Sequence, residues 1–163
     1  MQTTLSPPTS SDLEHPEVVA LAPRLYGVVF VLGLLLDWLW PQPIVPPVIG
    51  LSLGVPLILA GGVLAFRANL AMRRAGTTSN PSLPATVLVV TGPFRFSRNP
   101  LYVARTLLYI GLAFAMDVLW PLLLLGPLMV VIQHGVIERE ERYLDARFGN
   151  TYRHYQASVR RWL

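Results

Sequence analysis

Cysteine and lysine are both absent from this chain of 163 residues. Without cysteine there is no disulfide, no thiolate nucleophile and no cysteine-ligated zinc. Without lysine there is no catalytic ammonium group and no Schiff base. The three histidines lack the spacing of metal ligands, so we expect no metal site. A Ser-His-Asp set, a Walker loop and a GxGxxG motif are also absent from the sequence.

Charge is scarce as well. Only 13% of the residues are charged and 53% are hydrophobic, a balance that is typical of a membrane protein. The 13 basic residues are all arginine, and they lie beside apolar runs instead of forming a basic domain. Because this placement is typical of the ends of membrane spans, we expect a lipid bilayer around the chain and no nucleic-acid partner.

Four apolar runs predict four transmembrane helices. About 20 apolar residues cross a bilayer, with about 17 as the lower end, so the second and fourth runs are long enough and the other two need their flanks. The connections within each pair, WPQP and Asp117 alone, are so short that they predict two helical hairpins. We expect the spans at about 24–40, 44–66, 100–116 and 118–137.

The expected fold class is therefore all-α: an integral membrane protein with four transmembrane helices in two hairpins and a cytoplasmic C-terminal helical segment. Residues 1–20 are polar and lack the basic region of a signal peptide, so we interpret them as a disordered tail. Residues 21–163 then form a single domain. Its last part, 138–163, is expected to be helical to about Phe148, broken at Gly149 and helical again.

The placement of the arginines predicts the orientation of the chain. The two hairpin turns contain none, whereas the connector 67–100 and the C-terminal segment contain many. By the positive-inside rule, both termini and the connector face the cytoplasm. We expect the chain to be integral to a bacterial inner membrane.

The stretch TGPFRFSRNPLY, residues 91–102, is polar although it leads into the third span. Pro100 suits the first turn of a helix, and Asn99 before it is a candidate cap, which leaves N–H groups free to bind an anion. Arg95 and Arg98 add positive charge. The alternative interpretation is a capped helix whose arginines bind lipid phosphates.

The short run from Val87 to Val90 precedes this stretch and is rich in β-branched residues. An extended run offers backbone N–H and C=O groups, which can bind the edge of a flat heterocycle such as adenine. The alternative interpretation is an interfacial loop whose apolar side chains dip into the headgroups.

Three charged residues lie where charge is unusual. Arg105 is one turn inside the third span, where a charge usually faces a protein interior or a cavity, although it can also snorkel to the headgroups. Glu140 and Glu141 border the apolar stripe of the C-terminal helix instead of its solvated face. We take all three as candidate site residues.

These motifs resemble those of the membrane-integral methyltransferases related to isoprenylcysteine carboxyl methyltransferase and to phospholipid methyltransferases. The pattern is LVxTGPFRFSRNPLY, then a helical hairpin, then EERYLxxxFGxxYxxYxxxVRRW. The resemblance covers roughly residues 67–163. It implies S-adenosylmethionine as cofactor and a lipophilic acceptor, which could be a prenylated thiol, a lipid amine, or a small lipophilic carboxylate or thiol.

The resemblance also implies which residues contact the cofactor. They are the run before the glycine, the aromatic residue that follows it, the counterpart of an RHPxY motif and the first acid of an EExxL motif, to which we add the second acid. In this sequence these are Thr86, Val87, Leu88, Val89, Phe94, Arg98, Asn99, Pro100, Leu101, Tyr102, Glu140 and Glu141.

Two positions depart from the family pattern. The histidine of the RHPxY motif is replaced by Asn99, which can hydrogen-bond but cannot titrate. The arginine expected to contact the substrate, four residues before Glu140, is replaced by Val136. This second departure argues against an isoprenylcysteine carboxylate as substrate, and Arg105 and Arg139 are the candidates to replace the missing arginine.

We therefore predict S-adenosylmethionine-dependent methyl transfer in a pocket where the cytoplasm meets the bilayer, with Tyr102 and Arg105 as the catalytic residues that face the reacting centre. A water-soluble cofactor would enter from the cytoplasm and a lipophilic substrate from the membrane. Two alternatives remain. One is a membrane reductase with a nicotinamide cofactor, because sterol reductases have a similar C-terminal region, and the other is a non-enzymatic membrane scaffold of the same fold.

Overall fold

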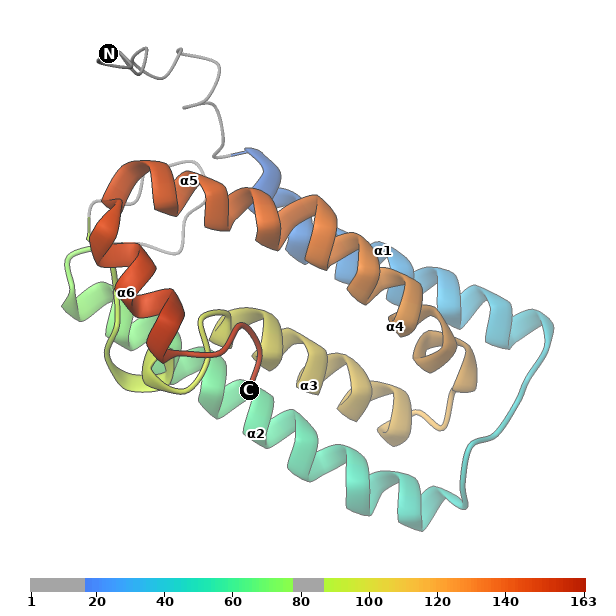
Figure 1. The fold of residues 1–163 in the computed structure, drawn as a ribbon. Helices are drawn as coiled ribbons and strands as arrows, with labels where there is room; N and C mark the ends of the chain where they lie inside the picture. The colour runs from blue at the N-terminus through green and yellow to red at the C-terminus, as the bar shows by residue number, and fades with distance from the viewer. Residues whose placement is uncertain (1–16, 78–86) are drawn as a thin grey trace, which may run out of the picture.

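The computed structural model describes residues 17–77 and 87–163, and these residues form helices and connecting turns without a β-strand (Figure 1). The all-α prediction is therefore confirmed. The first helix begins inside the segment 1–20 that was expected to be a tail. The six α-helices are α1 (Glu17–Leu39), α2 (Pro47–Arg74), α3 (Pro100–Ala115), α4 (Leu119–Ile132), α5 (Glu138–Phe148) and α6 (Asn150–Ser158).

The helices that pack most closely are not consecutive in sequence. α2 packs along α3, and α1 packs along α4, whereas α1 and α2 barely touch and α3 and α4 make few contacts (Figure 1). The prediction of two hairpins of consecutive helices is therefore wrong as a packing scheme. The loops 40–46 and 116–118, which contain WPQP and Asp117, join helices that pack against other partners.

Glycine explains why α2 prefers α3. A Cβ atom on Gly54 would lie 2.6 Å from the carbonyl oxygen of Gly111, and one on Gly61 would lie 2.8 Å from the carbonyl oxygen of Ala104. Such distances leave no room for a side chain, so the two backbones approach each other directly. Small residues play this part in membrane helix pairs, because hydrophobicity alone does not hold helices together in lipid.

Three helices are long and apolar enough to cross a membrane: Ala22–Leu39, Pro47–Arg74 and Leu119–Phe148. The last of these is one helix of 30 residues, because a π-helical segment, Gln133–Ile137, joins α4 to α5 without a break. α3 has 16 residues, a length of about 24 Å against a hydrocarbon core of about 30 Å. Three spans are thus supported, and the fourth stays a prediction.

One end of the bundle carries the two loops that join α1 to α2 and α3 to α4. Asp117 Oδ1 accepts hydrogen bonds from the backbone N–H groups of Ile44, at 2.8 Å, and Val45, at 3.1 Å. The indole N–H of Trp120 donates to the carbonyl of Trp40 at 2.8 Å. These bonds tie the two loops together although the helices they connect diverge.

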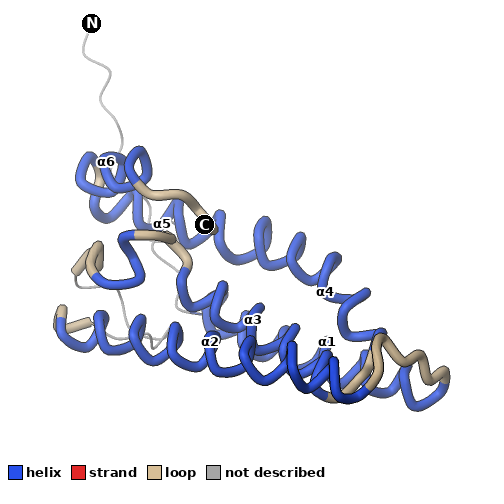
Figure 2. The backbone as a smooth tube through the Cα atoms, turned by 90° about the horizontal axis from the view of Figure 1, so that it is seen from below, coloured by secondary structure: helices blue, strands red, loops and turns tan. Residues whose placement is uncertain are grey.

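The opposite end, which we call the polar end, contains the start of α3, the helices α5 and α6 and the C-terminus (Figures 1 and 2). The predicted break at Gly149 is confirmed, since this residue has a positive φ of 51° and separates α5 from α6. The charged motifs of the sequence all lie here, beside a buried cluster that includes Tyr26, Tyr102 and Tyr109.

Candidate active site at the polar end of the bundle

The start of α3 forms a tight turn around Asn99. Pro100 is the first residue of the helix, as predicted, and Asn99 occupies the capping position. Its side chain does not cap the helix, because Nδ2 donates instead to the carbonyl of Arg161 at 3.0 Å. The backbone N–H of Asn99 donates to Ser97 Oγ, also at 3.0 Å. Ser97 and Asn99 are both buried, so this turn is a fixed part of the structure.

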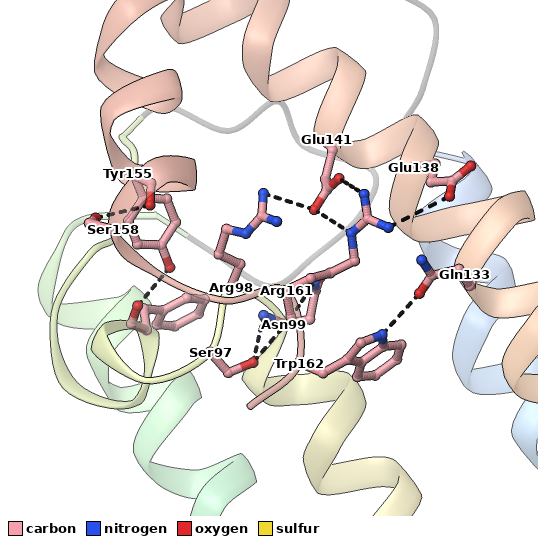
Figure 3. A network of polar contacts seen from close by, with 11 residues as sticks. Ser97, Arg98, Asn99, Gln133, Glu138, Glu141, Tyr155, Ser158, Arg161 and Trp162 are labelled. Carbon is pink, nitrogen blue, oxygen red and sulfur yellow. Dashed lines mark hydrogen bonds and ion pairs between the residues drawn. The ribbon is translucent and has the colours of Figure 1, made fainter.

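Three charged side chains meet beside this turn (Figure 3). Arg161 binds the Glu141 carboxylate with two parallel bonds, Nε to Oε1 at 3.1 Å and Nη2 to Oε2 at 2.7 Å. Arg98 Nη1 lies 3.1 Å from the same Oε1. Both oxygens of Glu141 are therefore engaged, and the hydrogen bonds with Glu141 raise the pKa of Arg161.

Arg98 has buried donors that no described residue uses. Its side chain is 12% exposed and that of Glu141 is 11% exposed. Nε of Arg98 is buried and makes no hydrogen bond to any residue in the part of the chain that the structure describes. Nη1 contacts Glu141 without the alignment of a hydrogen bond. A buried guanidinium with unused donors is suited to an anionic partner.

A second polar cluster lies one helical turn deeper. The Tyr102 hydroxyl donates to Glu140 Oε2 at 3.2 Å, and the guanidinium carbon of Arg105 lies 5.3 Å from the centre of the Tyr102 ring. The Thr106 hydroxyl, within hydrogen-bond distance of the carbonyl of Tyr102 at 3.0 Å, also lies 2.9 Å from the hydroxyl of Tyr26. Arg105 thus faces a carboxylate and an aromatic ring, as expected of a charge that points into the protein.

α6 covers the loop in front of α3. The Tyr155 hydroxyl donates to the carbonyl of Phe94 at 2.7 Å, and burial raises the pKa of this phenol, so it stays protonated. Tyr152 is almost fully buried next to Arg98 and Glu141. Burial raises its pKa, and the Glu141 carboxylate raises it further. Two aromatic residues of α6 thereby fix one wall of the site.

The predicted cofactor residues are only partly brought together. Thr86 lies outside the described residues. Val87 is exposed, Leu88 is half-buried and Val89 is buried, and none of the described residues around them forms a strand. The remaining predicted residues all lie at the polar end, and they are Phe94, Arg98, Asn99, Pro100, Leu101, Tyr102, Arg105, Glu140 and Glu141.

The position of the missing family arginine lies in the protein interior. Val136 is 1% exposed and belongs to the π-helical segment Gln133–Ile137, where it packs in the buried cluster. A side chain at this position faces no free space in this structure. Of the two candidate substitutes, Arg139 is exposed and Arg105 lies beside Tyr102 and Glu140.

Residues 159–163 are the part of the site that sequence reasoning missed. The pattern VRRW was visible as part of the family resemblance, but no role followed from it. In the structure Arg161 binds Glu141, and the Trp162 indole N–H donates to Gln133 Oε1 at 2.9 Å. The motif alone carries no signal for these contacts, or for the bond of the Arg161 carbonyl with Asn99, 62 positions away.

The described residues form apolar helices with a partly buried polar end, and three of these helices are long enough to cross a membrane, which fits an integral membrane protein. Residues 49–151 match the phospholipid methyltransferase family. Because this range is more than half of the chain, the protein belongs to that family of methyltransferases, as the resemblance predicted. The matched range ends before residues 159–163.

A second comparison finds a protein of Haemophilus influenzae, described as uncharacterized, that is 51% identical over 35 residues. The aligned segment covers 22% of this chain and 56% of that protein, so the chain spans just over half the length of this relative. No solved structure matches the chain.

Proposed function

We propose that this protein transfers a methyl group from S-adenosylmethionine to a lipophilic acceptor that reaches the site from the bilayer. One observation carries the proposal beyond family membership. The two motifs of the resemblance, 38 residues apart, meet through the bond of Tyr102 with Glu140 and the ion pair of Arg98 with Glu141. Membership of a methyltransferase family supports the proposed reaction type, and this junction supports our choice of the polar end as the proposed site.

The residues at this place fit the charges of the cofactor. Nε of Arg98 is a buried donor without a hydrogen bond to any described residue, as a carboxylate ligand would require. Glu140 is a half-buried carboxylate with one hydrogen bond, from Tyr102, and its negative charge favours a cationic group nearby. When bound, the cofactor would supply an electrophilic methyl group on a positively charged sulfur.

Within this proposal the chain has three tasks. Arg98 and the start of α3 hold the anionic end of the cofactor, and Glu140 favours its positive charge. Tyr102 and Arg105 face the acceptor. The contacts of Glu141 with two guanidinium groups favour a supporting role, in which it holds Arg98 in place. Methyl transfer depends on alignment and exclusion of water more than on a strong base, which this fixed, buried turn favours.

The sidedness of the site follows from the same proposal. S-adenosylmethionine is soluble in water, so we place the polar end and both termini in the cytoplasm, with the chain in a bacterial inner membrane. The arginines flanking the apolar helices agree with this orientation. Reporter fusions at residue 42 and at the C-terminus test it, and an external C-terminus would contradict it.

The proposed function is tested by binding and turnover with purified protein in detergent. We expect calorimetry to detect binding of S-adenosylmethionine and not of NADPH. We also expect label to pass from the methyl-labelled cofactor into lipid extract. Binding of NADPH alone would identify a reductase. Binding of neither ligand would leave a scaffold of the same fold, and either result would overturn the proposal.

Glu140→Gln tests the carboxylate in the site. The amide keeps the shape and loses the charge, so we expect roughly tenfold weaker binding of S-adenosylmethionine, the equivalent of one charge-assisted hydrogen bond. Asp145→Asn on the same helix is the matched control, because it removes the same charge from a more exposed position. Equal binding by both variants would show that Glu140 is not a cofactor residue.

Arg105→Leu tests the acceptor side. If Arg105 binds an anionic group of the acceptor, we expect turnover to be lost while affinity for S-adenosylmethionine stays close to wild type. Arg105→Lys should restore turnover only in part, because an ammonium group lacks the planar fork of a guanidinium. Full turnover by Arg105→Leu would remove this residue from the site and identify it as a charge that serves only the lipid boundary.

A further inference from the structure

The last five residues, 159–163, leave α6 and run across the start of α3 (Figures 1 and 3). We call this segment the C-terminal strap. It lies outside residues 49–151, which match the family, and the proposed function gives it no role beyond the contact of Arg161 with Glu141. Its contacts are nevertheless concentrated on the turn that holds Arg98 and Asn99.

Two carbonyl groups of the strap bind this turn. The carbonyl of Arg160 accepts the backbone N–H of Arg98 at 3.0 Å. The carbonyl of Arg161 accepts Asn99 Nδ2 at 3.0 Å and the hydroxyl of Ser97 at 3.4 Å. Three donors from three successive residues are thus satisfied by two successive residues of the strap. The position of the strap therefore sets the position of the turn.

Two side chains anchor the strap to the other side of the site. Arg161 binds both oxygens of Glu141 on α5 and lies 3.7 Å from Glu138. Trp162 donates to Gln133 and packs against the buried cluster. A parallel pair of bonds between guanidinium and carboxylate fixes both distance and angle, so Arg161 determines how far α5 lies from the start of α3.

We propose that Arg161 is a positioning residue, which acts through Glu141 and through its own carbonyl to hold Arg98 and Asn99 in the geometry that binds the cofactor. The proposal rests on the proposed function for the identity of the ligand. In this role Arg161 acts through its bonds to Glu141 and to the turn, without a direct contact with the cofactor. Through Glu141 it fixes the carboxylate that Arg98 Nη1 contacts at 3.1 Å, and so the place of the Arg98 guanidinium.

The neighbour Arg160 provides a matched control. Its side chain is exposed, and only its backbone carbonyl takes part in the strap. Arg160→Leu and Arg161→Leu therefore remove the same charge from adjacent positions and keep both carbonyls. Arg161→Lys keeps the charge and loses the parallel pair of bonds, which separates the geometry of the side chain from its charge.

The test has two readouts on purified full-length protein in detergent. The first is hydrogen–deuterium exchange of peptides covering residues 96–103 without ligand. The second is calorimetric affinity for S-adenosylmethionine, with the KM for cofactor and kcat measured on the same samples. We expect Arg161→Leu to speed exchange and to weaken affinity, each roughly tenfold, and to raise KM more than it lowers kcat. Arg161→Lys should fall between, and Arg160→Leu should match wild type.

Each other outcome has one meaning. Unchanged exchange in Arg161→Leu overturns the proposal, because the strap would then not hold the turn. Faster exchange with wild-type affinity also overturns it, since the strap would then serve stability alone. If wild-type protein binds no S-adenosylmethionine, the proposed function fails, and exchange alone decides whether Arg161 positions the turn. An Arg160→Leu variant as impaired as Arg161→Leu would refute the specific role of Arg161.

Discussion

α3 makes two contacts that differ in kind. Its contact with α2 is close packing of backbones at glycine, and the contact of its start with the strap is made by charged side chains and hydrogen bonds. The first contact requires residues without a side chain, because Gly54 and Gly61 face backbone carbonyls at distances that leave no room for a Cβ atom. The second contact requires particular charged side chains, because Arg98 and Arg161 both bind the carboxylate of Glu141. One helix, α3, takes part in both.

The two contacts serve different purposes: backbone packing makes the helix bundle rigid, and the charged contacts shape the proposed binding site. Close backbone packing involves no charged group, so the contact of α3 with α2 in the apolar region does not depend on a counter-charge. Charged contacts fail when one partner is removed, because the other stays buried without compensation. Backbone packing thus fixes α3 along its length, and charged contacts fix the turn at its start. Substitutions in each region should fail in different ways.

The largest effect is expected for Glu141→Gln, which leaves the mostly buried Arg98 without its counter-charge. We expect the free energy of unfolding to fall by about 3 kcal/mol, as when one partner of a buried ion pair is removed. Unfolding in mixed micelles with increasing sodium dodecyl sulfate measures this. Glu138→Gln, a more exposed acid on the same helix, is the control. A loss no greater than that of the control would contradict the comparison.

A smaller effect is expected for Gly61→Ala, which adds one methyl group 2.8 Å from the carbonyl oxygen of Ala104. Overpacking of this kind costs about 2 kcal/mol, because α2 must shift away from α3. Gly62→Ala is the control, since a Cβ atom there meets nothing within 4 Å. It should instead gain up to about 1 kcal/mol from helix propensity. The same unfolding assay measures both variants. A change of the free energy of unfolding in the same direction for Gly61→Ala and Gly62→Ala would refute the prediction.

The smallest effect is expected for Asp145→Asn. This acid binds Arg153 Nε at 2.9 Å, but the two side chains are 37% and 65% exposed. Exposed ion pairs are screened by water and salt, so the unfolding midpoint should stay within error of wild type. A clear loss of stability would show that exposed ion pairs at the polar end also stabilise the fold. It would contradict the distinction between buried and exposed pairs.

Local features of the fold were predictable from the sequence because each is decided by a few neighbouring residues. Pro100 begins α3, Gly149 separates the two C-terminal helices, and three of the four expected spans are long enough to cross a membrane. The second span was expected at 44–66, and the helix that carries it, α2, runs from Pro47 to Arg74. Arginines near the end of a span do not stop a helix when its backbone can continue into water.

The pairing of helices was not predictable, because loop length limits which helices can touch and does not choose among them. The choice lies in Gly50, Gly54 and Gly61, whose nearest partners on α3 are backbone oxygen atoms. Gly50 and Gly54 form a GxxxG pattern, which marks a face for close packing but does not identify the helix that packs there. The meeting of Tyr102 with Glu140 followed from the family resemblance and not from spacing. The role of Arg161 at the turn could not be predicted from the sequence either. The bonds to the turn are accepted by a backbone carbonyl, which every residue type has.

The pairing of α1 with α4 has a consequence for how the protein is made. The hydroxyls of Tyr26 and Thr106 are 80 residues apart in sequence, and α4 follows later still. At a synthesis rate of 5–20 residues per second, α1 stays in the bilayer for roughly 4–16 seconds before Thr106 is made. Its apolar sequence allows that wait. The strap follows α6 in the chain, so the two sides of the site can be joined only after α3, α5 and α6 have all been made.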